Sequence, residues 1–204
     1  MKNKKVLCII ITTITILAIG TIIWFLFIKN NDKKATEIKA IDNIEKYGYV
    51  LYENRTELYK NKFNELKDTL NKEELDEKKY AELIAELFVI DFYTLDNKVT
   101  NTDIGGVDFI HPNGRENFML KATDTIYKYI ESNVYNERNQ ELPTVSNVIV
   151  KTNEQKEYET KNVKDKNSYV INLDIEYEKD LEYPTNVTVI LVHDENKLYV
   201  VEVK

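Results

Sequence analysis

The first strong pattern in the chain is an apolar run from residue 6 to residue 28, which holds no charged residue, proline or amide side chain. A helix rises about 1.5 Å per residue, so about 20 apolar residues cross the hydrocarbon core of a bilayer. The run therefore predicts a single transmembrane helix over residues 6–28, preceded by a short tail at residues 1–5.

After this run, apolar residues recur at steps of three and four, which is the spacing of an amphipathic helix. The spacing predicts a helix over residues 32–71, broken near Gly48. Its first part is expected to continue from the membrane as a juxtamembrane stalk over residues 29–49. The positions that carry the pattern are Ile41, Ile44, Tyr47, Leu51, Leu58, Tyr59, Phe63, Leu66 and Leu70.

Two more helices are predicted at residues 71–95 and 113–132, because each opens with an Asn followed three residues later by Glu, the pattern of a capping box. Between them, Gly105 and Gly106 predict a turn, and residues 107–110 predict a short strand. The inward face of the third helix is predicted to hold Phe118, Ala122, Ile126, Tyr129 and Ile130.

Beyond Pro143 the apolar period changes to two, the spacing of a strand with one buried face. The clearest alternation runs from Tyr169 to Tyr177. Helices followed by a meander of strands predict an α+β domain over residues 50–204, with two to three helices packed on an antiparallel sheet of four to six strands. The predicted strands cover residues 145–152, 156–163, 168–178, 185–193 and 198–203.

The flanks of the apolar run decide between an anchor and a cleaved signal. The lysines of residues 1–5 fit the start of a secretory signal, and Ala18 and Gly20 resemble a cleavage site. The run continues well past them, which favours an uncleaved anchor. The basic tail, and a domain without cysteine after Cys8, favour a cytoplasmic amino terminus and an extracytoplasmic domain in the cell membrane.

The charge balance bears on the partners. The chain carries 28 Lys and Arg against 35 Asp and Glu, a formal charge of −7. Because residues 1–28 supply three lysines and no acid, the rest of the chain is more acidic still. Nucleic-acid binding needs clustered basic residues, so no nucleic-acid partner is expected. The expected partners are the membrane and another envelope protein, and the oligomeric state is open.

The order of elements over residues 50–204 resembles the nuclear transport factor 2-like superfamily. The resemblance rests on that order, on Asp91-Phe92-Tyr93 before the Gly-Gly loop, and on the terminal hairpin over residues 186–203. It implies a cone-shaped domain with a curved sheet. The superfamily includes isomerases and cyclases as well as catalytically silent modules. The chain looks most like the anchored bacterial class, which includes the periplasmic scaffold subunit of type IV secretion and conjugation machines.

The resemblance implies a pocket, and four residues are candidates for its polar groups: Asp91, Tyr93, Asp108 and His111. An isomerase-type site pairs a carboxylate base with a proton donor in an apolar cavity. Asp91 and Tyr93 are two positions apart, so on a helix they face different directions. The competing interpretation places Asp91 at a helix end as a solvated or capping acid and Tyr93 in the core.

Metal and cofactor motifs are absent from the sequence. His111 and His193 are the only histidines, which is too few for zinc without a domain cysteine. The oxygens of Asp96, Asn101, Asp103 and Asp108 lack the spacing of an EF-hand. No metal and no cofactor is therefore expected. The chain is predicted to be a non-enzymatic interaction or scaffold module of the envelope. The alternative is a cone-fold enzyme or small-ligand-binding ectodomain that uses Asp91 or Asp108.

Overall fold

The computed structural model describes residues 17–24 and 38–204 and divides the chain into two units, Met1–Glu37 and Ile38–Lys204. Residues 17–24 form a helical segment with exposed side chains. Within the described residues, no helix is long and apolar enough to cross a membrane. This finding corrects the predicted fold class, which placed a transmembrane helix before the α+β domain. The tail at residues 1–5 and the other positions of the 6–28 run lie outside the described residues.

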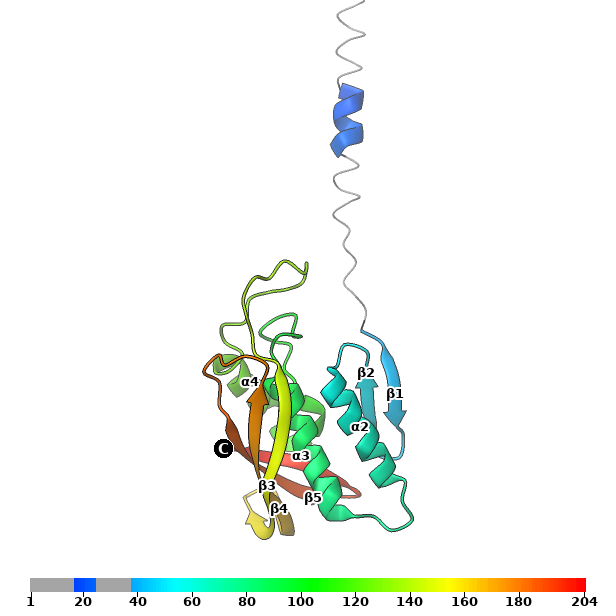
Figure 1. Ribbon diagram of the computed structural model, residues 1–204, viewed down its shortest axis with the longest axis vertical. Helices are drawn as coiled ribbons and strands as arrows, with labels where there is room; N and C mark the ends of the chain where they lie inside the picture. The colour runs from blue at the N-terminus through cyan, green and yellow to red at the C-terminus, as the bar shows by residue number, and fades with distance from the viewer. Residues whose placement is uncertain (1–16, 25–37) are drawn as a thin grey trace, which may run out of the picture. The chain divides into compact units, whose positions relative to one another are not determined.

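The second unit is an α+β domain, which confirms that part of the prediction (Figure 1). Four antiparallel strands follow one another in the order β3-β4-β5-β6, so neighbours in the sequence are neighbours in the sheet. The predicted alternation in β4 is confirmed, since Tyr169, Ile171, Leu173 and Ile175 are buried. The strands are β3 (Val145–Glu159), β4 (Lys164–Tyr177), β5 (Asn186–Asp194) and β6 (Lys197–Val203).

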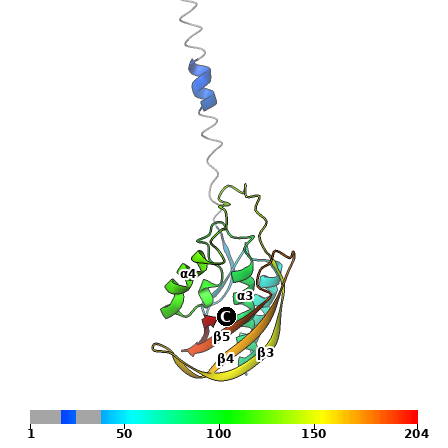
Figure 2. The ribbon, with the colours of Figure 1, turned by 90° about the vertical axis from the view of Figure 1, so that its left-hand side faces the viewer.

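The β3–β4 hairpin is longer than the rest of the sheet and curved. Residues 145–152 and 156–163 were predicted as two strands. In the structure the single strand β3 covers the first of these ranges and the start of the second. Its register shifts between Val150 and Thr152 and again between Lys156 and Tyr158. Such irregularities bend a strand without ending it. Figure 2 shows that the hairpin curves until its tip comes round toward α4 (Arg115–Asp124).

Helix α3 (Glu77–Tyr93) lies at the centre of the domain, between the sheet and α2 (Glu57–Leu70) (Figure 1). Nearly every residue of α3 from Tyr80 to Tyr93 is buried, because both of its sides are covered. The cap is Asp76, whose carboxylate accepts the backbone N–H of Lys79 at 3.0 Å. The predicted capping role of Asn71 was wrong, since Asn71 closes the end of α2.

Before α2 the chain forms a hairpin, where a helix over residues 32–71 was predicted. Strand β1 (Ala40–Ile44) pairs with β2 (Tyr49–Tyr52) in antiparallel register, and Gly48 makes the turn with φ of +67°. Steps of three and four among few apolar residues also fit two short strands, so the pattern was ambiguous here. The described part of the expected stalk, residues 38–49, is therefore part of this hairpin and of the compact unit. Residues 29–37 lie outside the described residues.

The segment between α3 and the sheet is more irregular than expected. The predicted strand at residues 107–110 is the 3-10 helix η1 (Val107–Phe109), followed by a single parallel bridge between Ile110 and Val200. A second 3-10 helix, η2 (Pro112–Gly114), leads into α4. That helix ends at Asp124 and not near Ser132 as predicted. Tyr129, expected on its inward face, is therefore exposed.

Candidate functional site

Asp91, the first candidate base, is the centre of a buried ion-pair cluster. Its Oδ1 atom lies 2.5 Å from a guanidinium nitrogen of Arg55 and 2.7 Å from Nζ of Lys98. Its Oδ2 atom accepts the backbone N–H of Gly106 at 2.8 Å. Burial raises the pKa of this carboxyl, but the charges of Lys98 and Arg55 outweigh burial and lower it overall. A carboxylate held in this way is a structural anion, which makes it a poor proton acceptor.

The Gly105-Gly106 turn packs directly against the end of α3. A Cβ atom on Gly105 would lie 2.1 Å from the carbonyl oxygen of Asp91, so only glycine fits there. The Tyr127 hydroxyl joins the same region, since it donates to the Phe92 carbonyl at 2.6 Å and accepts the Gly105 N–H at 3.0 Å. The two glycines, predicted only as a turn, therefore allow the loop to pack directly against the end of the helix.

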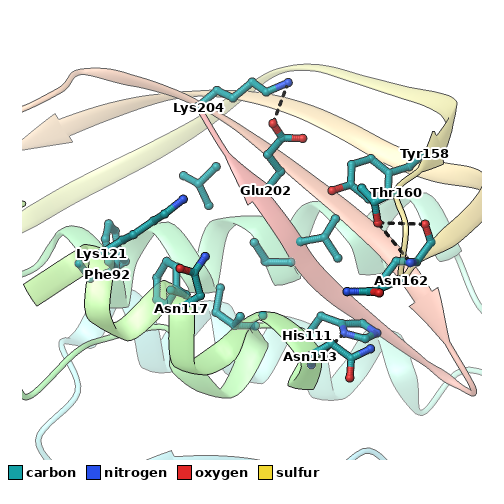
Figure 3. Close-up of a pocket in the computed structure, with 18 of the residues that line it drawn as sticks. Phe92, His111, Asn113, Asn117, Lys121, Tyr158, Thr160, Asn162, Glu202 and Lys204 are labelled. Atoms are coloured by element: carbon teal, nitrogen blue, oxygen red, sulfur yellow. Dashed lines mark hydrogen bonds and ion pairs between the residues drawn. The ribbon is translucent and has the colours of Figure 1, made fainter.

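A cavity of about 460 Å³ lies beyond this end of α3 (Figure 3). Four segments supply its walls: the last residues of α3, the η2–α4 segment with the residues after it, the end of β6, and the tip of the β3–β4 hairpin. Its volume falls within the range of small-molecule and peptide-side-chain sites. The cavity exists because α4 is short and the curved hairpin returns toward it.

The lining combines an apolar interior with a polar rim. Apolar side chains come from both sides, with Phe118 and Ile126 opposite Val200 and Val203. Figure 3 shows Asn117 and Lys121 pointing from α4 toward β6. The remaining polar residues of the lining are His111, Asn113, Thr125, Tyr158, Thr160, Asn162, Glu202 and Lys204.

Charged groups at the rim are unevenly paired. On β6, the Lys204 ammonium lies 3.1 Å from the Glu202 carboxylate. On α4, Lys121 takes part in none of the salt bridges among residues 38–204. Near the hairpin tip, burial and then the charge of Glu202 raise the pKa of Tyr158, so its phenol stays protonated at neutral pH. The rim therefore offers one cation without a partner, a set of amide groups and a phenol.

The structure brings two of the four predicted site residues to the cavity and leaves two away from it. Tyr93 and His111 line the cavity, whereas Asp91 and Asp108 do not. Burial raises the pKa of Tyr93. His111 is held in place, since its Nδ1 accepts the Asn113 N–H at 3.3 Å and its Nε2 lies 3.4 Å from Asp194. Asp108 is exposed on η1.

The second histidine and the acidic loop each make contacts of their own. His193 contacts Asp165 through Nδ1 at 2.7 Å and Glu77 through Nε2 at 3.1 Å, so it joins the sheet to the start of α3. Asp103 accepts the Val99 N–H at 3.0 Å, as an Asx side chain does in a turn. Among the described residues, no three His, Cys, Asp or Glu side chains converge closely enough to hold a metal ion.

Sequence reasoning missed most of the polar rim. The predicted inward positions Phe118, Ala122 and Ile126 do line the cavity. Helical spacing places Asn117 and Lys121 beside them on α4, which was the available signal. The sequence did not indicate that this face would lie opposite the edge of β6, because that depends on the curvature of the sheet.

No protein-family model matches the chain, and neither the search of curated proteins nor the search of solved structures finds a significant match.

Proposed function

We propose that residues 38–204 form a binding module, which holds part of another protein in the cavity between α4 and β6. The observation that carries this proposal is the cavity itself, whose lining combines apolar side chains from both sides with polar and charged ones. Protein and peptide sites commonly have this arrangement, since the apolar interior supplies binding energy and the rim sets orientation.

The alternative is an enzyme that uses Asp91 or Asp108 as a base, and two observations weigh against it. Asp91 is already neutralised by Arg55 and Lys98, and it is not part of the cavity lining. Asp108 is exposed and is not part of the lining. A general base must reach the substrate proton, and neither carboxylate is placed to do so from this cavity.

The resemblance to the nuclear transport factor 2-like superfamily stays a prediction, supported by helices that precede a curved antiparallel meander (Figure 2). The same holds for an envelope partner and an extracytoplasmic location. The surface of the unit adds support for a protein partner over a nucleic acid, because the exposed face of β4 carries Asp174 and Glu176.

Site-directed photo-crosslinking in the native cells tests the binding module. A benzophenone amino acid placed at Asn117 points toward β6, and the same residue at Asn61 on α2 is the matched control, since both are exposed asparagines on helices. The proposal predicts a discrete covalent adduct with one other protein from position 117 and none from position 61. Recovery of only the uncrosslinked chain from both positions would contradict it.

A further inference from the structure

Resting on the proposed function, we infer that the cavity binds its partner by strand addition. An extended peptide would pair with the free edge of β6, place alternate apolar side chains in the cavity, and direct a carboxylate to Lys121. The inference names both the kind of partner and the backbone groups that recognise it.

The outer edge of β6 has backbone groups available for pairing. Lys204 and Thr188 exchange both backbone hydrogen bonds, N–H to C=O, at 2.9 and 3.0 Å. In an antiparallel pair such exchanges alternate with positions whose N–H and C=O point away from the neighbour. Val203, opposite Val189, is such a position, so its N–H and C=O face outward. In residues 38–204, β6 pairs along this outer edge only at Val200.

The chain itself already pairs with this edge at one isolated position, Val200. Ile110 forms a parallel bridge with Val200, and the His111 N–H donates to the Val200 carbonyl at 2.9 Å. The chain then turns away through η2 into α4, which leaves the edge from Val201 onward facing the cavity. A bound peptide would continue the pairing that residues 110–111 begin.

The surroundings of the edge match an extended peptide. Side chains of an added strand point alternately to its two faces. One face would meet Phe118 and Ala122 on α4 and Ile126 just after it, which line the cavity together with the end of β6. Lys121, on the same helix and without an acidic partner among residues 38–204, complements a carboxylate on the peptide. An unpaired edge beside an apolar wall is the arrangement used in strand addition.

The test begins with the full chain in mild detergent and a phage-displayed library of linear peptides. Selected peptides are synthesised with and without N-methyl groups at alternate amides, and their Kd values are measured by calorimetry. N-methylation removes backbone donors and leaves the side chains in place. We expect it to raise Kd about tenfold or more in one of the two alternating registers, since one lost hydrogen bond corresponds to about tenfold.

A pair of protein variants tests the backbone pairing by changing the protein in place of the peptide. Val203→Pro removes an outward N–H and is compatible with an edge strand, while Val203→Thr keeps the N–H and nearly the same shape. We expect Val203→Pro to raise Kd about tenfold relative to Val203→Thr, which also alters the side chain of this lining residue but keeps its N–H donor. Amide-exchange protection at Thr188 and Lys204 checks that the β5–β6 ladder remains intact in both variants.

The outcomes separate this inference from the proposed function. If peptides bind in the cavity but neither N-methylation nor Val203→Pro weakens them, strand addition is overturned and the binding module remains. If no peptide is selected, strand addition is also overturned, and the adduct from position 117 alone decides the proposed function. If Val203→Pro disturbs the ladder, the N-methylated peptides on the unaltered chain give the decision.

Discussion

At the scale of single residues, Asp91 holds the end of α3 and the loops around it in place. Its carboxylate contacts a cation from before α2, a cation from after α3 and the backbone of the Gly-Gly turn. The contacts with Lys98 and with the turn are buried and the contact with Arg55 is partly buried, with the Lys98 side chain only 2 % exposed. Removing one member of a buried ion pair leaves the others uncompensated, which makes Asp91 the most sensitive polar position of the unit.

Replacing Asp91 with asparagine is therefore expected to lower the free energy of unfolding by about 3–5 kcal/mol, because Arg55 and Lys98 would lose their buried counter-charge. Urea unfolding followed by circular dichroism measures the loss. Asp108→Asn is the matched control on an exposed acid, with an expected change of less than about 0.5 kcal/mol. Equal effects of the two substitutions would refute the structural role of Asp91.

The same carboxyl predicts a pH dependence. Its pKa in the folded state lies below its ordinary value of 3.8. A lowered pKa means that the stabilisation is complete above the unfolded-state value and is lost as the pH falls through the folded-state value. The difference in unfolding free energy between the native chain and Asp91→Asn should therefore be constant near neutral pH and shrink below about pH 4. A difference that stays constant into strong acid would be inconsistent with this assignment.

These residue-level roles show what a sequence alone leaves open. Asp91 near the end of a helix was interpreted as a solvated or capping acid or as a catalytic base, whereas the structure makes it a buried anion. Its partners Arg55 and Lys98 come from different loops and meet it only after folding. Tyr93 and His111 line the cavity, but no spacing in the sequence connected them with Lys121.

At the scale of elements, the Gly-Gly turn shows how backbone freedom positions the wall of the cavity. Gly106 has φ of +73°, which side-chain-bearing residues rarely adopt, and a Cβ atom there would lie 2.7 Å from the Phe88 ring. Gly48 has a similar φ of +67° but open space around it. The two positions separate the cost of backbone strain from the cost of a steric clash.

Gly106→Ala is thus expected to destabilise the unit by more than Gly48→Ala, whose cost is the backbone strain alone, about 1–3 kcal/mol. The extra loss comes from displacement of Phe88 and of the hydrogen bond from Gly106 to Asp91. Thermal or urea unfolding of the two variants gives the comparison. A smaller effect at position 106 than at position 48 would mean that the loop shifts freely away from α3.

Among the elements, strands with strict alternation were predictable and short apolar segments were not. The alternation of β4 fixed its buried face, and the predicted terminal hairpin over residues 186–203 is the β5–β6 hairpin. The β1–β2 hairpin was mistaken for a helix because its apolar residues recur at steps of three and four, although one of them, Tyr47, lies in the turn between the two short strands. Helix α4 was predicted to be too long. The Tyr127 hydroxyl, just after the helix, donates to the Phe92 carbonyl at the end of α3, and the neighbouring sequence does not indicate this contact.

At the scale of the whole folded unit, the cavity depends on three features that are distant in the sequence. These are the early end of α4, the bend of the β3–β4 hairpin and the free edge of β6. The α+β class followed from the order of patterns, but the cavity did not, since bulges and helix ends set its walls. The proposed binding function therefore rests on a space between elements and not on a motif within one of them.

The proposal that the cavity is the binding site is tested by filling the cavity from α4 and measuring crosslinking from the hairpin tip. Asn117→Trp places a large side chain into the space from an exposed position of α4, and a benzophenone amino acid at Thr160 reports from the hairpin tip. We predict that the adduct formed from position 160 in native cells disappears when Asn117→Trp is added, while the unfolding free energy changes by less than about 1 kcal/mol. An adduct that persists at full yield in the filled variant would contradict binding within the cavity.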